Sequence, residues 1–180
     1  MPCIELSEGF CEKLRREASK GDVSVEELVA ETLSEAPGAP LDPSRVELHL
    51  ELCGKYLKEA GKLLAEGDYS QASEKGWGAA AQIVKALAAR KGKTLRSHRE
   101  LWGYVDELVE RFGDAEVRRL WHAANALHQN FYESWMTPKS VAAALEDVKL
   151  LMGKLRKLER LLGAVARDQR EGADALEEQA

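Results

Sequence analysis

The sequence predicts an all-α protein, and three observations lead to this prediction. Apolar residues recur every three or four positions through most of the 180 residues, which is the spacing of one helix face. Capping boxes at Ser24–Glu27 and Ser97–Glu100 supply side-chain partners for the first amides of a helix. All five prolines lie outside the periodic segments or at their start, where proline does not interrupt a helix.

Residues 1–36 form the first predicted unit. Cys3–Leu6 alternates polar and apolar residues and predicts a short strand. A helix is expected from Ser7, and a second helix from the Ser24 cap. This order of strand, helix, turn and helix resembles a ribbon-helix-helix module. The resemblance implies dimerisation through paired strands, and in transcription factors such a ribbon enters the major groove.

The charge of this extension favours dimerisation over DNA binding. Residues 1–36 carry four basic and nine acidic side chains, so they account for the whole net charge of −5. A strand that carries Glu5 would meet DNA phosphates with charge of the same sign. We therefore expect the extension to dimerise or dock, with a plain structural extension as the alternative. We expect no sequence-specific DNA binding.

A linker at residues 37–42 is expected to separate the extension from a helical bundle at residues 43–166. Proline and glycine dominate the start of this linker and cannot continue a helix. Five helices follow, and the short turns between them predict an up-and-down bundle. Their first turns are marked by cap residues and prolines: Asp42–Pro43, Asp68, Ser97, Asp114 and Thr137–Pro138. Residues 167–180 are polar and acidic and predict a flexible tail.

The apolar stripes of these helices define the expected core. Four side chains sample it: Leu57, Ile83, Leu127 and Leu155. Cys53 lies on a core stripe, where a thiol is normally inert. Gly76 and Gly78 precede three alanines and present little side chain, so we expect a neighbouring helix to approach closely there.

Composition and charge exclude several classes of protein. Hydrophobic residues make up 44% and charged residues 32%, a balance that supports a packed core and excludes a disordered chain. No apolar run approaches the ~20 residues of a membrane span, and no signal peptide is recognisable. We therefore expect a cytoplasmic protein. The three cysteines lack a paired spacing and predict reduced thiols, and the scarcity of asparagine resembles thermophile proteins.

The helix predicted from Asp114 to Trp135 holds the candidate functional residues. At about 100° per residue, one polar stripe includes Arg118, His122, Asn125, Gln129 and Tyr132. His128 lies between this stripe and the apolar face, where a partly buried imidazole can act as a general acid or base. Arginine, asparagine and tyrosine nearby could hold a phosphate. The alternative is a polar stripe that is simply solvated.

Cofactor and metal sites are not expected. Neither a phosphate-binding glycine loop nor a dinucleotide fingerprint occurs. His122 and His128 are six positions apart and point about 120° away from each other, unlike the i, i+4 histidine pair of a helical zinc site.

Four stretches together resemble the archaeal PaREP family: Tyr56–Ala60, Gly67–Ala80, Ser97–Trp102 and Ala124–Glu133. The resemblance covers roughly residues 43–160. That family is similar in turn to HEPN helical domains, which occur beside minimal nucleotidyltransferases in toxin–antitoxin pairs. Catalytic HEPN members are metal-independent ribonucleases. The resemblance implies a HEPN-like bundle that pairs through a symmetric interface, with a nucleotidyltransferase-like protein or RNA as partner.

The HEPN ribonuclease motif is an arginine followed, after four to six positions, by a histidine. His128 matches that histidine, whereas His122 stands where the arginine would fall. A neutral histidine stabilises phosphate charge poorly. The sequence therefore predicts a non-catalytic interaction or RNA-associated module, assembled as a homodimer.

The alternative is a metal-independent endoribonuclease. In it His128 would be the acid or base, with Arg118, Arg119 and His122 on the phosphate and Asn125 orienting them. The candidate binding residues in either case are Gln129, Tyr132 and Glu133.

Overall fold

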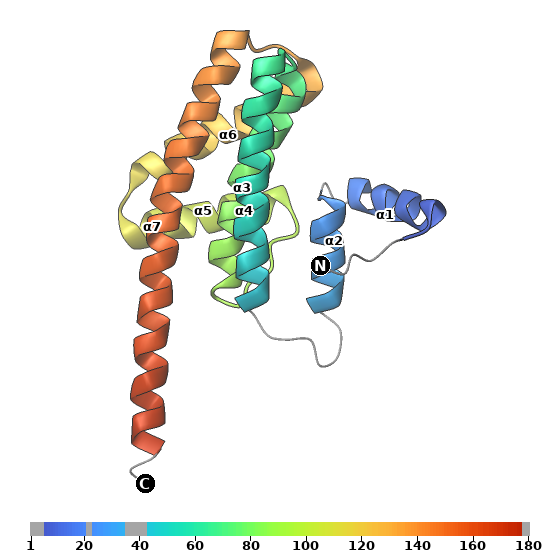
Figure 1. Ribbon diagram of the computed structural model, residues 1–180. Helices are drawn as coiled ribbons and strands as arrows, with labels where there is room; N and C mark the ends of the chain where they lie inside the picture. The colour runs from blue at the N-terminus through green and yellow to red at the C-terminus, as the bar shows by residue number, and fades with distance from the viewer. Residues whose placement is uncertain (1–5, 21–22, 35–42, 178–180) are drawn as a thin grey trace.

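The computed structural model describes residues 6–20, 23–34 and 43–177, and every regular element in these ranges is an α-helix. The elements are α1 (Glu8–Lys20), α2 (Val25–Ser34), α3 (Pro43–Glu66), α4 (Tyr69–Ala89), α5 (His98–Phe112), α6 (Ala115–Glu133) and α7 (Pro138–Glu177) (Figure 1). The all-α prediction is therefore confirmed. None of these helices is both long and apolar enough to cross a membrane.

The N-terminal extension differs from the ribbon-helix-helix prediction. Of the predicted strand Cys3–Leu6 only Leu6 lies within the described residues, and it is not in a strand. A strand this short has no stability without a partner strand, so the described extension consists of α1 and α2 alone. The predicted linker at residues 37–42 lies outside the described residues. At the other end, α7 continues to Glu177, well into the predicted tail.

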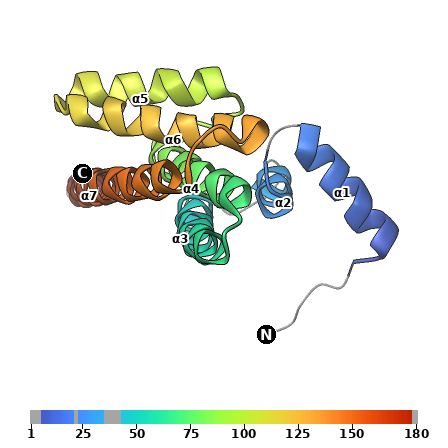
Figure 2. The ribbon, with the colours of Figure 1, turned by 90° about the horizontal axis from the view of Figure 1, so that it is seen from above.

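The helices after residue 43 form two layers that cross, and this corrects the predicted up-and-down order. Figure 2 shows α5 and α6 lengthwise and side by side, whereas α3 and α4 are seen nearly end-on. Short turns fix which helices are neighbours in sequence. The crossing angle depends on how side-chain ridges fit between helices, and the turns do not contain that information.

The core surrounds α4, which contacts α3, α5, α6 and α7. Ile83, Leu127 and Leu155 have no exposed surface, as predicted, but Leu57 is only half-buried at the edge of its stripe. A Cβ at Gly76 would overlap Leu145 Cδ2 and would lie 2.9 Å from Leu127 Cδ1. Only glycine therefore allows α6 and α7 to approach α4 this closely.

Local capping signals are placed largely as the sequence predicts. The Ser97–Glu100 box is complete at the start of α5. Gly113 ends that helix with a φ of 70°, a left-handed conformation that glycine adopts without steric cost. Cys53 is fully buried, and burial raises the pKa of its thiol to about 11, consistent with an inert core thiol.

Candidate functional site

The first half of α6 does not gather its candidate residues into a site. The Arg118 guanidinium binds Asp106 of α5 at 2.8 Å, and Arg119 binds Glu116 of its own helix at 2.8 Å. His122 is exposed, and its ring packs edge-on against Trp102 at 4.8 Å between ring centroids. These three side chains have separate partners, so the predicted phosphate-holding group is not formed.

His128, six residues further along α6, belongs to a different cluster. Its imidazole lies 4.9 Å from the Trp77 ring of α4 and 4.8 Å from the His98 ring of α5, measured between ring centroids. The Glu74 carboxylate lies 3.5 Å from His128 Nδ1. Tyr132 meets His128 edge-on at 5.3 Å. We call Glu74, Trp77, His98, His128 and Tyr132 the ring cluster.

The ring cluster exists because α5 and α6 cross α4. The Ser97 cap starts α5 at the point where His98 stacks on Trp77, with 5.3 Å between ring centroids. One helical turn separates His128 from Tyr132, so both reach the same end of α6. His128 is 14% exposed and Tyr132 is 64% exposed. The cluster therefore grades from a largely buried imidazole to an open aromatic ring.

A cavity of about 500 Å³ opens beside the ring cluster. Every member of the ring cluster except His128 lines this cavity. The rest of the wall includes Ser19 of α1, Glu27 of α2 and Tyr56 of α3. Arg96 and Lys75 add positive charge to the lining. The Lys75 ammonium is held 2.7 Å from Glu59 of α3. The cavity is thus aromatic at one side and charged at the other.

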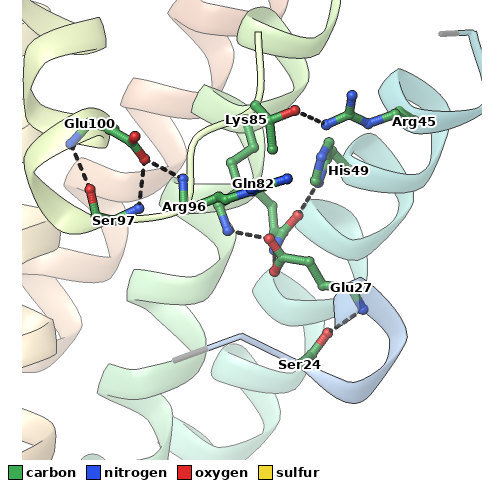
Figure 3. Close-up of polar contacts among 10 residues, drawn as sticks. Ser24, Glu27, Arg45, His49, Gln82, Lys85, Arg96, Ser97 and Glu100 are labelled. Carbon is green, nitrogen blue, oxygen red and sulfur yellow. Dashed lines mark hydrogen bonds and ion pairs between the residues drawn. The ribbon is translucent and has the colours of Figure 1, made fainter. Parts of the chain in front are cut away.

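The charged side of the cavity is a buried polar network (Figure 3). Glu27 of α2 is 2% exposed, and its carboxylate accepts hydrogen bonds from the Lys85 ammonium and from Gln82 Nε2. Gln82 Oε1 lies 2.6 Å from His49 Nδ1 of α3. Because an amide oxygen only accepts, His49 carries its proton on Nδ1. Burial lowers the pKa of His49, although Gln82 and Glu27 oppose that effect.

The network corrects one cap prediction. Ser24 accepts a hydrogen bond from the Glu27 backbone N–H at 3.0 Å, as the capping box predicts. The Glu27 carboxylate, however, points away from the helix end toward Lys85 and Gln82. A charge-assisted bond inside the protein is stronger than a bond to an exposed amide, so α2 is held to α4 by this carboxylate.

The remaining candidates lie around the ring cluster without joining it. Asn125 is half-buried, whereas Gln129 and Glu133 are exposed. Sequence reasoning singled out His128 and Tyr132 but missed Glu74, His98 and the buried network. One signal was available: Gln82 and Lys85 are the only polar residues between Ala79 and Ala89. Within the described ranges, no group of three His, Cys, Asp or Glu side chains could hold a metal ion.

These features define an all-helical protein with a mixed aromatic and charged cavity where its helix layers cross. The chain belongs to the Archaeal PaREP1/PaREP8 family, whose model matches residues 48–152. It is similar to a protein from Sulfolobus solfataricus of known crystal structure, with 26% identity and a TM-score of 0.53. That match covers 59% of this chain and 94% of the other chain. A comparison with curated proteins gives no match.

Proposed function

We propose that this chain is a non-catalytic, HEPN-like module that binds single-stranded RNA at the ring cluster. The observation that carries the proposal is the pair of exposed rings of His98 and Tyr132, which pack against the buried ring of Trp77 and the largely buried ring of His128. Bases of single-stranded nucleic acid stack on such rings, and each stacked base contributes about 1–3 kcal/mol. Arg96 and Lys75 line the adjoining cavity and bring positive charge near the phosphates.

The overall charge limits how this binding works. A net charge of −5 gives no long-range attraction for nucleic acid. Affinity must therefore come from stacking and from a few local cations. We accordingly expect a shallow dependence of RNA affinity on salt concentration, unlike that of a basic groove.

The arrangement of the two imidazoles favours binding over cleavage. RNA cleavage without a metal needs one group to take the 2′-hydroxyl proton and another to protonate the leaving 5′-oxygen. These two oxygens lie on opposite sides of the reacting phosphorus. His98 and His128 instead lie ring to ring, with 4.8 Å between centroids, which leaves no room for a phosphate between them.

The second candidate function is a metal-independent endoribonuclease that uses His128. The Glu74 carboxylate beside His128 Nδ1 favours it, because a carboxylate orients an imidazole for proton transfer. In that reaction a bond forms from the 2′-oxygen to phosphorus and the bond to the 5′-oxygen breaks. The products are a 2′,3′-cyclic phosphate and a 5′-hydroxyl. For Arg118, Arg119 and His122 to hold the phosphate, as the sequence suggests for this alternative, they would have to leave their present contacts.

Partners follow from the same proposal. We propose a homodimer, in line with the HEPN resemblance, and a place in a toxin–antitoxin-like pair with a nucleotidyltransferase-like protein. Leu6, which precedes α1, and Phe10 on α1 are 45% and 49% exposed, which supports a docking role for the extension. Sedimentation of the chain with and without residues 1–36 tests this: weaker self-association of the truncated chain is expected.

The RNA proposal is tested by fluorescence anisotropy with a labelled single-stranded RNA of about ten nucleotides. His98→Ala and Tyr132→Ala should each weaken binding by about tenfold. His122→Ala is the matched control, because that histidine also packs on an aromatic ring, and it should leave affinity unchanged. Equal affinity of all four proteins would contradict the proposal.

A separate assay with the same RNA distinguishes binding from cleavage. We expect intact RNA after incubation in EDTA with the wild type and with His128→Ala. EDTA-resistant cleavage by the wild type, abolished in His128→Ala, would establish the endoribonuclease instead.

A further inference from the structure

The buried end of the cavity contains a group of donors directed at one carboxylate. The Lys85 ammonium and Gln82 Nε2 both donate to Glu27. Lys85 has a side chain that is 9% exposed, and His49 and Gln82 are 3% and 2% exposed. We call Lys85, Gln82 and His49 the Lys85 niche. The niche is a buried cationic site in which His49 aligns Gln82, and in which Gln82 and Lys85 both reach the same carboxylate.

The donors and the acceptor come from different parts of the chain. All three niche residues lie within residues 48–152, which the family model matches, and Glu27 lies before that region. The match with the Sulfolobus protein covers 94% of that protein, but 41% of this chain has no counterpart in it. The niche therefore belongs to the family region, and the carboxylate that occupies it is supplied by the extension.

The chemistry of the niche fits a phosphate as well as a carboxylate. Both anions offer two or more oxygens to converging donors, and lysine binds phosphate as a point charge. His49 Nδ1–H fixes Gln82 Oε1, so Gln82 Nε2 is directed at the anion. Lys85, Gln82 and Glu27 line the same cavity as Trp77 and His98. A phosphate on a base stacked at the rings could therefore enter this niche.

We propose that the Lys85 niche is a phosphate-binding site and that Glu27 is its internal occupant. A phosphate ester binds there by displacing the Glu27 carboxylate from Lys85 and Gln82. The inference rests on the proposed function in one respect only, namely that the phosphate comes from RNA. Binding of inorganic phosphate by the niche does not depend on the RNA proposal.

Removal of Glu27 should open the niche. Without its carboxylate, the buried ammonium of Lys85 has lost the counterion that compensates its desolvation. An added anion that restores this pairing binds the folded protein and raises its Tm. Glu27→Gln is the preferred variant, because it has the size of glutamate and removes only the charge. Glu27→Ala, which also frees space, provides an independent second variant.

The experiment measures Tm against inorganic phosphate at constant ionic strength, with chloride as the balancing ion. From zero to tens of millimolar phosphate, Tm should rise by about 5 °C in Glu27→Gln or Glu27→Ala and by less than about 1 °C in the wild type. The matched control Glu27→Gln/Lys85→Met should not respond. A response of the double variant equal to that of Glu27→Gln, or no response of either single variant beyond chloride, overturns the proposal.

Two further arms identify the source of the phosphate. Adenosine monophosphate and a short RNA with a 5′-phosphate replace inorganic phosphate in the titration of Glu27→Gln. A phosphate response without RNA binding by any variant supports the niche and contradicts the RNA function. RNA binding that is equal in Glu27→Gln and in Glu27→Gln/Lys85→Met supports the RNA function and overturns RNA as the source of the phosphate in the niche.

Discussion

Helix α4 is buried along most of its length, but its two sides are buried in different ways. One side packs only apolar groups, and we call it the dry side: Gly76 lies against Leu127 of α6 and Leu145 of α7. The other side is polar, and we call it the wet side: Gln82 and Lys85 bind Glu27 of α2, and the ring cluster adjoins the same cavity. One helix therefore serves both as the centre of the core and as the floor of the candidate site.

The contrast shows that a sequence predicts the burial of apolar groups better than the burial of charged groups. Burial of apolar groups depends on area removed from water and is almost independent of partner identity. Burial of a charge is tolerated only when specific partners are present. The dry side can therefore be predicted from spacing, whereas the wet side requires three distant segments to be placed together.

The largest expected effect is on the dry side. Leu127 has no exposed surface, so Leu127→Ala should lower the free energy of unfolding by about 2–5 kcal/mol, measured by urea denaturation. Leu57→Ala is the comparison, because Leu57 is half-buried, and it should cost clearly less. Equal losses at both positions would contradict the assigned core.

Gly76 tests how tightly the dry side is packed. A Cβ there would meet two leucine methyl groups, so Gly76→Ala should cost about 1–3 kcal/mol through overpacking. Gly61→Ala on α3 is the matched control, because nothing lies within 4 Å of its Cβ position. It should stabilise the chain by about 0.5–1 kcal/mol through helix propensity. Thermal melts should therefore show a lower Tm for Gly76→Ala and a higher Tm for Gly61→Ala.

The wet side should make stability depend on pH. Burial lowers the pKa of folded His49 below its ordinary value of 6.5, so the unfolded chain takes up this proton at higher pH than the folded chain. The resulting stability is fully present above pH 6.5 and is lost as pH falls through the folded pKa. Glu27, Lys85 and Arg45 all act on this imidazole.

Urea unfolding at pH 7.5 and 5.5 measures the effect of His49. The wild type should lose at most about 1.4 kcal/mol per pH unit from this group. His49→Gln retains an N–H donor for Gln82 and should show a shallower slope. Identical slopes would show that His49 is not the group responsible.

The smallest effect is expected at the first half of α6, away from both sides of α4. The Arg118–Asp106 ion pair is 42% and 49% exposed, so Arg118→Ala should cost less than about 1 kcal/mol. RNA affinity should not change. A double-mutant cycle with Asp106→Ala measures the interaction energy of the pair. A tenfold loss of RNA affinity in Arg118→Ala would show that Arg118 belongs to the RNA-binding site.

The parts of the fold that depend on neighbouring residues could be predicted from the sequence. The Ser97–Glu100 box and the Gly113 end of α5 are formed within one or two helical turns. Ile83 and Leu127 are buried because their helices carry clear apolar stripes. In each case the residue pattern that allows the prediction lies within one helix.

The candidate site could be predicted only in part, because it depends on crossing angles between helices. The sequence predicts His128 as a boundary residue, but it places His98 only within a helix cap. Glu27 was expected to complete a cap, whereas Lys85 and Gln82 offer its carboxylate a better pairing. The polar pair within the apolar run Ala79–Ala89 was the local sign that a partner would be needed.

Histidine side-chain NMR during an RNA titration tests the proposed function most directly, because the chain's four histidines sample distinct places. His98 and His128 belong to the ring cluster, His49 to the Lys85 niche, and His122 to the opposite part of α6. We predict that a short single-stranded RNA shifts the His98 and His128 ring signals and leaves the His122 signal unchanged. A shift of His122 with no shift of His98 or His128 would contradict the proposed site.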